Sequence, residues 1–138
     1  MRLWHYKLIP ALPKAQLISQ WRECISIKRK WENGTLNHRL VNYVMNYNGR
    51  YFYNYVGLIT DEMVRRNINF NIELFEEIQE FCKPDLFEDN FEIYYPEHND
   101  AYLIQCYYNL QEKHDRGIIS EKEWQKILKV AYEEDIIE

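Results

Sequence analysis

The sequence has few turn-forming residues, with four glycines and four prolines among its 138 residues. A sheet of many short strands needs such residues at frequent turns, so their scarcity favours a few long helices. The length fits one domain that can bury a hydrophobic core. We therefore predict an all-α fold class: a single compact domain, residues 1–138, of about five to six helices.

Cysteines and long apolar runs are also scarce. The three cysteines, Cys24, Cys82 and Cys106, are far apart and outside any C-x-x-C pair. This spacing indicates neither a disulfide framework nor a zinc site. No apolar run approaches the roughly 20 residues of a membrane span, and the first ten residues lack a signal-peptide core. We expect a cytoplasmic protein with no membrane contact, no metal and no cofactor.

The common short site motifs are missing as well. The sequence has no Gly-rich phosphate loop, no dinucleotide fingerprint, no H-E-x-x-H and no G-x-S-x-G. We interpret His98 and Asn99 as the cap of a helix, and His114 as a charge that complements a helix end. His38 is interpreted as a hydrogen-bonded structural histidine, and Cys24 as an inert core thiol.

The charges are unevenly distributed along the chain. The net charge is −5, but residues 1–66 carry a balance of +7 and residues 67–138 a balance of −12. Because the cations gather in one half, that half can form a face that binds a polyanion. The acidic second half would face away from a polyanion or contact a protein partner.

Residues 13–31 predict one long amphipathic helix, around which we expect the chain to be organised. Its predicted inward face consists of Leu17, Ile18, Trp21, Cys24, Ile25, Lys28 and Trp31. On the outward face a single carboxylate, Glu23, lies among Arg22, Arg29, Lys30 and the charged end of Lys28. The pattern taken alone fits an ordinary surface salt bridge.

The rest of the chain predicts an ordered arm and further helices. Residues 1–12 form the arm, which its apolar side chains pin to the core. Helices are expected at 36–47, 50–66, 71–81 and about 99–113, and a last one from the capping box Ser120-x-x-Glu123. Their inward stripes include Leu40, Met45, Val64 and Ile72. Residues 82–96 predict an ordered loop, and residues 132–138 an acidic, frayed tail.

Several strings of residues carry a family resemblance. They are Met1-Arg2-Leu3-Trp4-His5, Leu8-Ile9-Pro10, Leu12-Pro13, Gln16-Leu17, Trp21-Arg22-Glu23, His38-x-x-Val41-Asn42-Tyr43-Val44 and Tyr95-Pro96-Glu97-His98-Asn99-Asp100. With them the chain resembles the pyrimidine-dimer DNA glycosylase family, of the bacteriophage endonuclease V type, and in particular its short bacterial relatives. The resemblance is specific over the first 45 residues and looser up to residue 113.

The resemblance implies a helical DNA glycosylase with abasic-site lyase activity. In this family the nucleophile is the N-terminal main-chain amine, which here is that of Met1 because the bulk of Arg2 prevents removal of the methionine. The carboxylate that assists is Glu23. The resemblance and the basic first half together suggest phosphate contacts from Arg2, Arg22, Lys28, Arg29, Lys30 and Arg39.

This chemistry is reasonable for the residue types involved. An α-amine ordinarily titrates near pH 8, so part of it is neutral and nucleophilic at neutral pH. A carboxylate within reach can stabilise a cationic sugar or move a proton. Base flipping also benefits from aromatic surfaces, for which Trp4 or Tyr6 is available.

The expected partner is damaged or abasic DNA, bound by a monomer. Two alternatives remain open at this stage. The chain can be a non-catalytic helical binding protein on the same scaffold, with the acidic half as its partner surface. It can also be an N-glycosidase-like enzyme that acts on another nucleotide or on RNA.

Overall fold

The computed structural model describes residues 1–84 and 93–138, and within them every regular element is helical. The elements are η1 (Tyr6–Ala11), α1 (Lys14–Glu32), η2 (Asn42–Asn46), α2 (Gly49–Arg65), α3 (Ile72–Cys82), α4 (Asp100–Asp115) and α5 (Glu121–Glu133). The predicted all-α fold is therefore confirmed. Part of the loop expected at 82–96, residues 85–92, lies outside the described residues.

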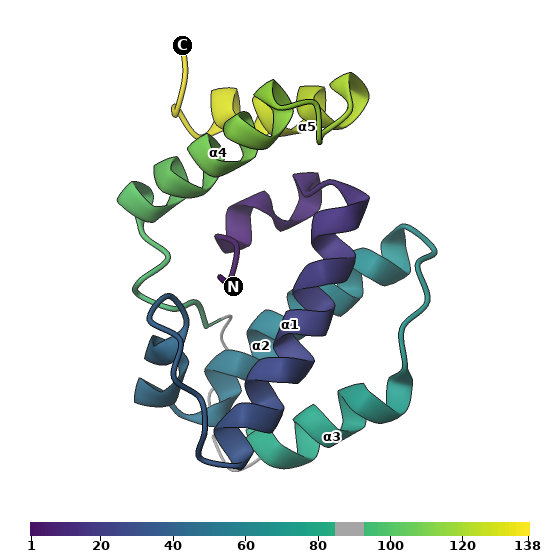
Figure 1. Ribbon diagram of the computed structural model, residues 1–138, viewed down its shortest axis with the longest axis vertical. Coiled ribbons are helices and arrows are strands. Elements are labelled where there is room, and N and C mark those ends of the chain that lie inside the picture. Colours follow the sequence, from purple (N-terminus) through teal and green to yellow (C-terminus); the bar gives the residue numbers. More distant parts are fainter. Residues whose placement is uncertain (85–92) are drawn as a thin grey trace.

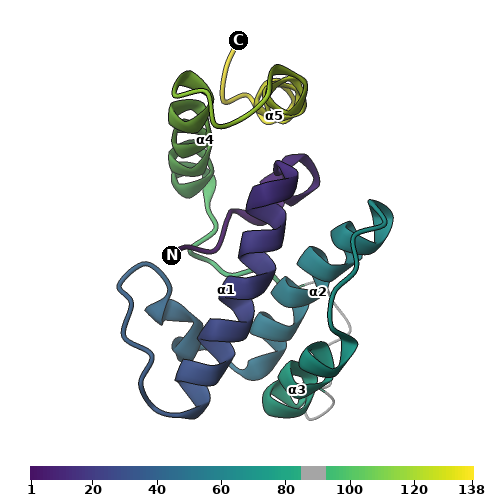
Figure 2. The same ribbon diagram turned by 45° about the vertical axis from the view of Figure 1, so that its right-hand side comes forward.

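The helices form two groups with the N-terminal arm between them. Helices α1, α2 and α3 pack against one another, while α4 pairs with α5. Figure 1 shows the chain's first residues in the middle of the molecule, beside α1, with the α4–α5 pair above. The rotated view in Figure 2 keeps this order. The arm is therefore an internal element of the fold.

Side-chain caps explain where four of the helices begin. Asn48, Asn71 and Asn99 each accept a hydrogen bond from a backbone N–H in the first turn of α2, α3 and α4. Ser120 accepts from the Glu123 N–H and so forms the predicted capping box of α5. The predicted cap at Asn99 is confirmed. These local signals placed the starts of α2 to α5 close to their predicted positions.

The prediction of a helix over residues 36–47 is wrong. Only the short 3₁₀ helix η2 forms there, because the Asn42 side chain accepts from the His38 N–H at 2.7 Å. The Val41 N–H donates to the His38 carbonyl three residues back, which is the spacing of a turn or 3₁₀ helix. Such local bonds offer the backbone an alternative to an α-helix. Leu40 and Met45, expected inward, are consequently exposed.

The buried faces of the other helices also differ from the predicted stripes. On α1, Gln20 and Ile27 are buried, whereas Ile18 and Ile25 are only partly buried. Val64, at the end of α2, and Ile72, at the start of α3, are exposed. Residues at helix ends extend past the partner helices, so the periodic pattern overestimates their burial.

Helix α5 and the end of α2 hold the arm from outside. The Lys7 ammonium pairs with Glu134 at 2.9 Å, and the Lys14 N–H donates to Glu123 at 3.0 Å. Arg66 donates to the carbonyls of Leu12 and Pro10 at 2.7 and 3.0 Å. Part of the tail predicted to fray is thus in contact with the arm, and its residues Ile136 and Ile137 pack against the core.

Candidate active site

Four hydrogen bonds fix the backbone of the first residues. Gln20 donates to the Arg2 carbonyl at 2.9 Å and accepts from the Trp4 N–H at 2.7 Å. Tyr55 donates to the Trp4 carbonyl at 2.7 Å, and Tyr102 to the Leu3 carbonyl at 2.5 Å. These donors and acceptors come from α1, α2 and α4. The chain's first residues are therefore held at the meeting point of three helices.

Gln20 uses both ends of its amide. It is fully buried, and its oxygen accepts from Tyr55 as well as from Trp4. Its nitrogen donates to the Arg2 carbonyl and, at 2.9 Å, to the Glu23 carboxylate one turn along α1. All four hydrogen-bonding positions of a primary amide are thereby occupied.

Glu23 is a half-buried carboxylate at the side of the arm. Burial raises the pKa of the Glu23 carboxyl above its ordinary value. The positive charge of the chain's N-terminus, hydrogen bonds from the Arg2 backbone and Gln20, and the charge of His38 act in the opposite direction on this pKa. The α-amine of Met1 is therefore within electrostatic range of Glu23.

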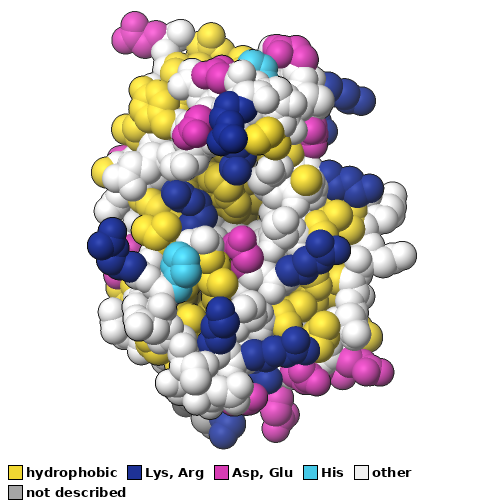
Figure 3. Space-filling model, in the orientation of Figure 1, with side chains coloured by type: hydrophobic (Ala, Val, Ile, Leu, Met, Phe, Trp, Pro, Cys, Tyr) yellow, Lys and Arg dark blue, Asp and Glu magenta, His cyan; other side chains and the backbone are white. Residues whose placement is uncertain are grey.

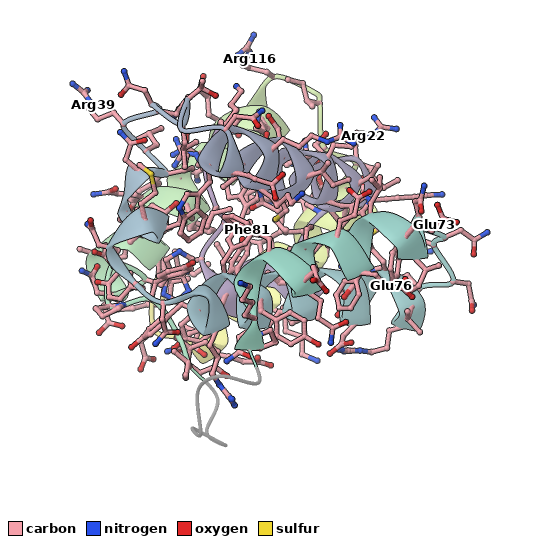
Figure 4. All side chains as sticks on the ribbon, turned by 90° about the horizontal axis from the view of Figure 1, so that it is seen from below. Arg22, Arg39, Glu73, Glu76, Phe81 and Arg116 are labelled. Carbon is pink, nitrogen blue, oxygen red and sulfur yellow. The ribbon has the colours of Figure 1, made fainter. Side chains whose placement is uncertain are left out.

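Four of the six cations expected to bind DNA are exposed. Arg22, Arg29 and Lys30 lie on α1, and Arg39 lies in the segment that follows it. Figure 4 shows Arg22 and Arg39 reaching out on the same side of the molecule, beyond α1. Figure 3 shows Lys and Arg side chains spread over the face that carries α1. This group of four cations is called the basic face below.

The other two cations lie in different surroundings. The Lys28 side chain is buried, and its ammonium pairs with Glu32 at 3.1 Å beside the Phe81 ring. Arg2 lies over the Trp4 ring, and its guanidinium is 3.5 Å from the Asn109 side chain of α4. Both cations already have partners within the fold.

The acidic half presents a separate surface. Glu73, Glu76, Glu77 and Glu80 line a groove on α3 together with Lys28, Glu32, Phe81 and Lys83. Figure 4 shows Glu73 and Glu76 on α3, away from Arg22 and Arg39. The acidic side chains of α3 thus gather along one groove, apart from Arg22 and Arg39.

The aromatic residues expected to help base flipping are packed into the fold. Trp4 is buried, and the Tyr6 ring stacks on Tyr94 with 3.9 Å between centroids.

Cys24 is fully buried, and burial raises the pKa of its thiol, as predicted for an inert core cysteine. His98 is buried against Tyr43, whose hydroxyl is 2.8 Å from its Nε2.

A comparison with family models adds independent information. The model of the pyrimidine dimer DNA glycosylase family matches residues 1–76. The chain belongs to this family. The matched residues include the arm, α1, η2, α2 and the start of α3. A search of curated proteins and a search of solved structures found no match.

The matched part of this pyrimidine dimer DNA glycosylase family member contains Met1, Glu23 and the basic face. Helices α4 and α5 lie outside it, although α4 supplies Tyr102 to the arm.

Within residues 1–84 and 93–138, no three His, Cys, Asp or Glu side chains are grouped to bind a metal ion. In the same residues no helix has the length and apolar character needed to cross a membrane.

Sequence reasoning missed the residues that hold the arm, Gln20, Tyr55 and Tyr102. One signal was available for Gln20. It follows Leu17 by three residues and precedes Cys24 by four, so it lies on the buried stripe of α1. A polar side chain in such a position needs buried hydrogen-bond partners. The sequence did not show that the backbone of the arm supplies them.

Proposed function

We propose that this family member is a DNA glycosylase with abasic-site lyase activity, with the Met1 α-amine as nucleophile and Glu23 as the assisting carboxylate. The observation that carries the proposal is a hydrogen-bonded connection: the Gln20 amide nitrogen donates both to the Arg2 carbonyl, one residue after the N-terminal amine, and to the half-buried Glu23. The positive charge of the N-terminus supports it, because this charge favours the ionised form of Glu23. A nucleophilic amine and a carboxylate at one site are the groups that imine chemistry at a sugar requires.

The proposed reaction begins when the lone pair of the neutral amine attacks C1′ of the damaged nucleotide. The bond from C1′ to the base breaks, its electrons leave with the base, and the base takes up a proton. The sugar ring then opens as an imine forms between the Met1 nitrogen and C1′. Loss of a proton from C2′ expels the 3′ phosphate by β-elimination, and water releases the amine. The Glu23 carboxylate stabilises the cationic sugar and can move these protons.

The basic face is the proposed phosphate-binding surface. Arg22, Arg29, Lys30 and Arg39 are exposed, as cations that contact a DNA backbone must be. Arg22 directly precedes Glu23, so a phosphate bound there would lie next to the proposed reaction centre. We leave Lys28 out of this surface, because its ammonium is buried in a pair with Glu32. Arg2 is proposed to order the arm against α4 rather than to bind phosphate.

Borohydride trapping tests the proposal directly. The protein is mixed with duplex DNA that carries an abasic site or a pyrimidine dimer, and the imine is reduced. We expect a covalent adduct of one protein and one DNA strand, and peptide mapping should place it on the Met1 nitrogen. The matched control is the same protein with its N-terminus acetylated, which should bind DNA and form no adduct.

The absence of a covalent adduct would contradict the proposed lyase activity. A folded protein with a free N-terminus, confirmed by mass spectrometry, that forms no adduct on either DNA would contradict the proposal. Retained DNA binding in that case would favour a non-catalytic binding protein on this scaffold. An adduct that survives N-terminal acetylation would instead assign the nucleophile to a lysine side chain.

A further inference from the structure

We infer that Gln20 is a positioning residue. Its buried amide fixes the position of the chain's first residues relative to the Glu23 carboxylate. The inference rests on the proposed function, since it concerns how that function's two reacting groups are brought together. Gln20 is not proposed to touch the substrate. It holds the arm through its bonds to Arg2 and Trp4, and it holds the Glu23 carboxylate through a separate bond.

The hydrogen bonds of Gln20 reach both the arm that carries the proposed nucleophile and the Glu23 carboxylate. Its amide contacts the backbone at Arg2 and at Trp4, two residues apart, which fixes the position and the direction of the arm. The Met1 amine is separated from the Arg2 carbonyl by only a few bonds. The Gln20 nitrogen also donates to Glu23 at 2.9 Å. Displacement of this amide would therefore move the nucleophile and the carboxylate relative to each other.

The site requires an amide at this position. A glutamate has the same shape but offers no N–H, so it would lose the bonds to the Arg2 carbonyl and to Glu23. It would also place a second carboxylate at hydrogen-bond distance from the first, and like charges at that distance repel. An apolar side chain would leave the Trp4 N–H without its Gln20 acceptor, while the Tyr55 hydroxyl would keep only the Trp4 carbonyl.

The amide also affects the charge state of Glu23. Burial favours the neutral carboxyl, while the hydrogen bond from Gln20 favours the carboxylate. A carboxylate that must stabilise a cation is useful only in its charged form. Gln20 thus contributes twice, by fixing the distance between the groups and by keeping one of them ionised. A purely structural glutamine would do only the first.

The test compares Gln20→Glu and Gln20→Met with the wild-type protein by two measurements. The first is the rate of adduct formation with saturating abasic DNA, expected to fall about 100-fold because a misplaced reacting group costs that much. The second is NMR titration of the Glu23 carboxyl in the protein without DNA. Its midpoint is expected to move to higher pH in both variants.

Two variants serve as controls. Gln16→Glu places the same new charge one turn earlier on α1, on a partly exposed side chain, and should leave the Glu23 titration unchanged. Tyr55→Phe removes a bond on the oxygen side of the Gln20 amide and leaves both nitrogen bonds. It should therefore keep the Glu23 midpoint and report the cost to folding of disturbing this network.

Each outcome separates the two proposals. Gln20→Glu and Gln20→Met proteins that fold and keep both the adduct rate and the Glu23 midpoint would overturn the inference. A wild-type protein that forms no adduct would instead contradict the proposed function. In that case the NMR titration, which needs no activity, still decides whether Gln20 controls Glu23. A rate loss with an unchanged midpoint, or with weaker DNA binding, would reduce Gln20 to a structural residue and so also overturn the inference.

Discussion

The side-chain nitrogen of Gln20 donates to the Glu23 carboxylate at 2.9 Å, across one turn of α1. The same nitrogen donates to the carbonyl of Arg2, so a residue inside a helix connects the chain's beginning to its half-buried acid. In a member of the pyrimidine dimer DNA glycosylase family, this connection joins the two groups that we propose react with DNA.

Replacement of the acid tests its role. Glu23→Gln should lower single-turnover cleavage of dimer-containing or abasic DNA at least about 100-fold, because the cationic sugar loses its carboxylate. DNA affinity should stay the same or rise, since a negative charge beside the basic face is removed. Glu133→Gln, on an exposed side chain of α5, is the matched control. If Glu23→Gln abolishes folding, as judged by thermal melting, the glutamate is structural.

The pH dependence of activity should report the same carboxyl. Burial raises the pKa of Glu23 above its ordinary value of 4.5, so the group takes up its proton at a higher pH than an exposed glutamate. Protonation of the amine already slows the reaction as pH decreases, and protonation of Glu23 should add a second, steeper fall with a midpoint above 4.5. A pH–rate profile measured with saturating DNA, on protein shown to be folded at each pH, checks this. An acidic limb at or below 4.5 would contradict the assignment.

Salt dependence should identify the phosphate contacts. Arg22→Ala should weaken binding to all DNA sequences and reduce the slope of log K against log salt by about 1, as expected for one lost phosphate contact. Lys122→Ala removes an exposed cation from α5 and should leave the slope unchanged. Fluorescence anisotropy across a salt series measures both. Equal slopes for Arg22→Ala and the wild type would remove Arg22 from the DNA-binding surface.

Acid should destabilise the fold through two buried histidines. Burial lowers the pKa of His5 from 6.5 to about 4 and that of His98 to about 3. Between pH 6.5 and 4 the unfolded chain binds protons at these residues and the folded chain does not. The free energy of unfolding should therefore fall as pH decreases through this range, by up to about 1.4 kcal/mol per pH unit for each histidine.

Urea unfolding at several pH values measures this slope. His98→Gln keeps a hydrogen-bonding side chain next to the Tyr43 hydroxyl and removes one titrating group. The slope for this variant should be roughly half that of the wild type. An unchanged slope would mean that other groups, such as carboxylates with lowered pKa values, cause the acid sensitivity.

Two glycines of α2 should respond oppositely to alanine. A Cβ at Gly49 would lie 2.2 Å from the Cys82 carbonyl oxygen, so Gly49→Ala must push α2 away from the end of α3. We expect a loss of about 1–3 kcal/mol, as for other overpacked sites. Gly57→Ala meets no atom within 4 Å and should stabilise the helix by about 0.5–1 kcal/mol. Chemical denaturation compares them, and a neutral Gly49→Ala would contradict the close approach.

Much of the helix pattern could be predicted from the sequence, because it depends on local signals. The starts of α4 and α5 follow from the caps Asn99 and Ser120. The segment 36–47 could not be predicted in this way. Its apolar spacing resembles a helix, but the Asn42 side chain binds the His38 backbone instead. The spacing of apolar residues gives no sign that a side chain will compete with the helical hydrogen bonds of the backbone.

The sequence named candidate site residues but could not give their arrangement. Lys28 was grouped with its basic neighbours, yet it faces Phe81 and pairs with Glu32, since its position on α1 turns it toward α3. Trp4 was expected to offer a surface for a flipped base and is instead part of the core. In both cases a neighbouring helix decided which side of the residue is open.

The sequence by itself determined that the chain is helical, that its cations and acids lie in different halves, and that Glu23 is a lone acid among bases. These properties depend on residue type and short-range spacing. Only the tertiary structure decided which groups meet at Glu23. Gln20 reaches the arm 16 and 18 residues away, and Tyr55 lies another 35 residues along the chain. A buried amide is stable only where such distant partners satisfy it, and folding alone brings them together.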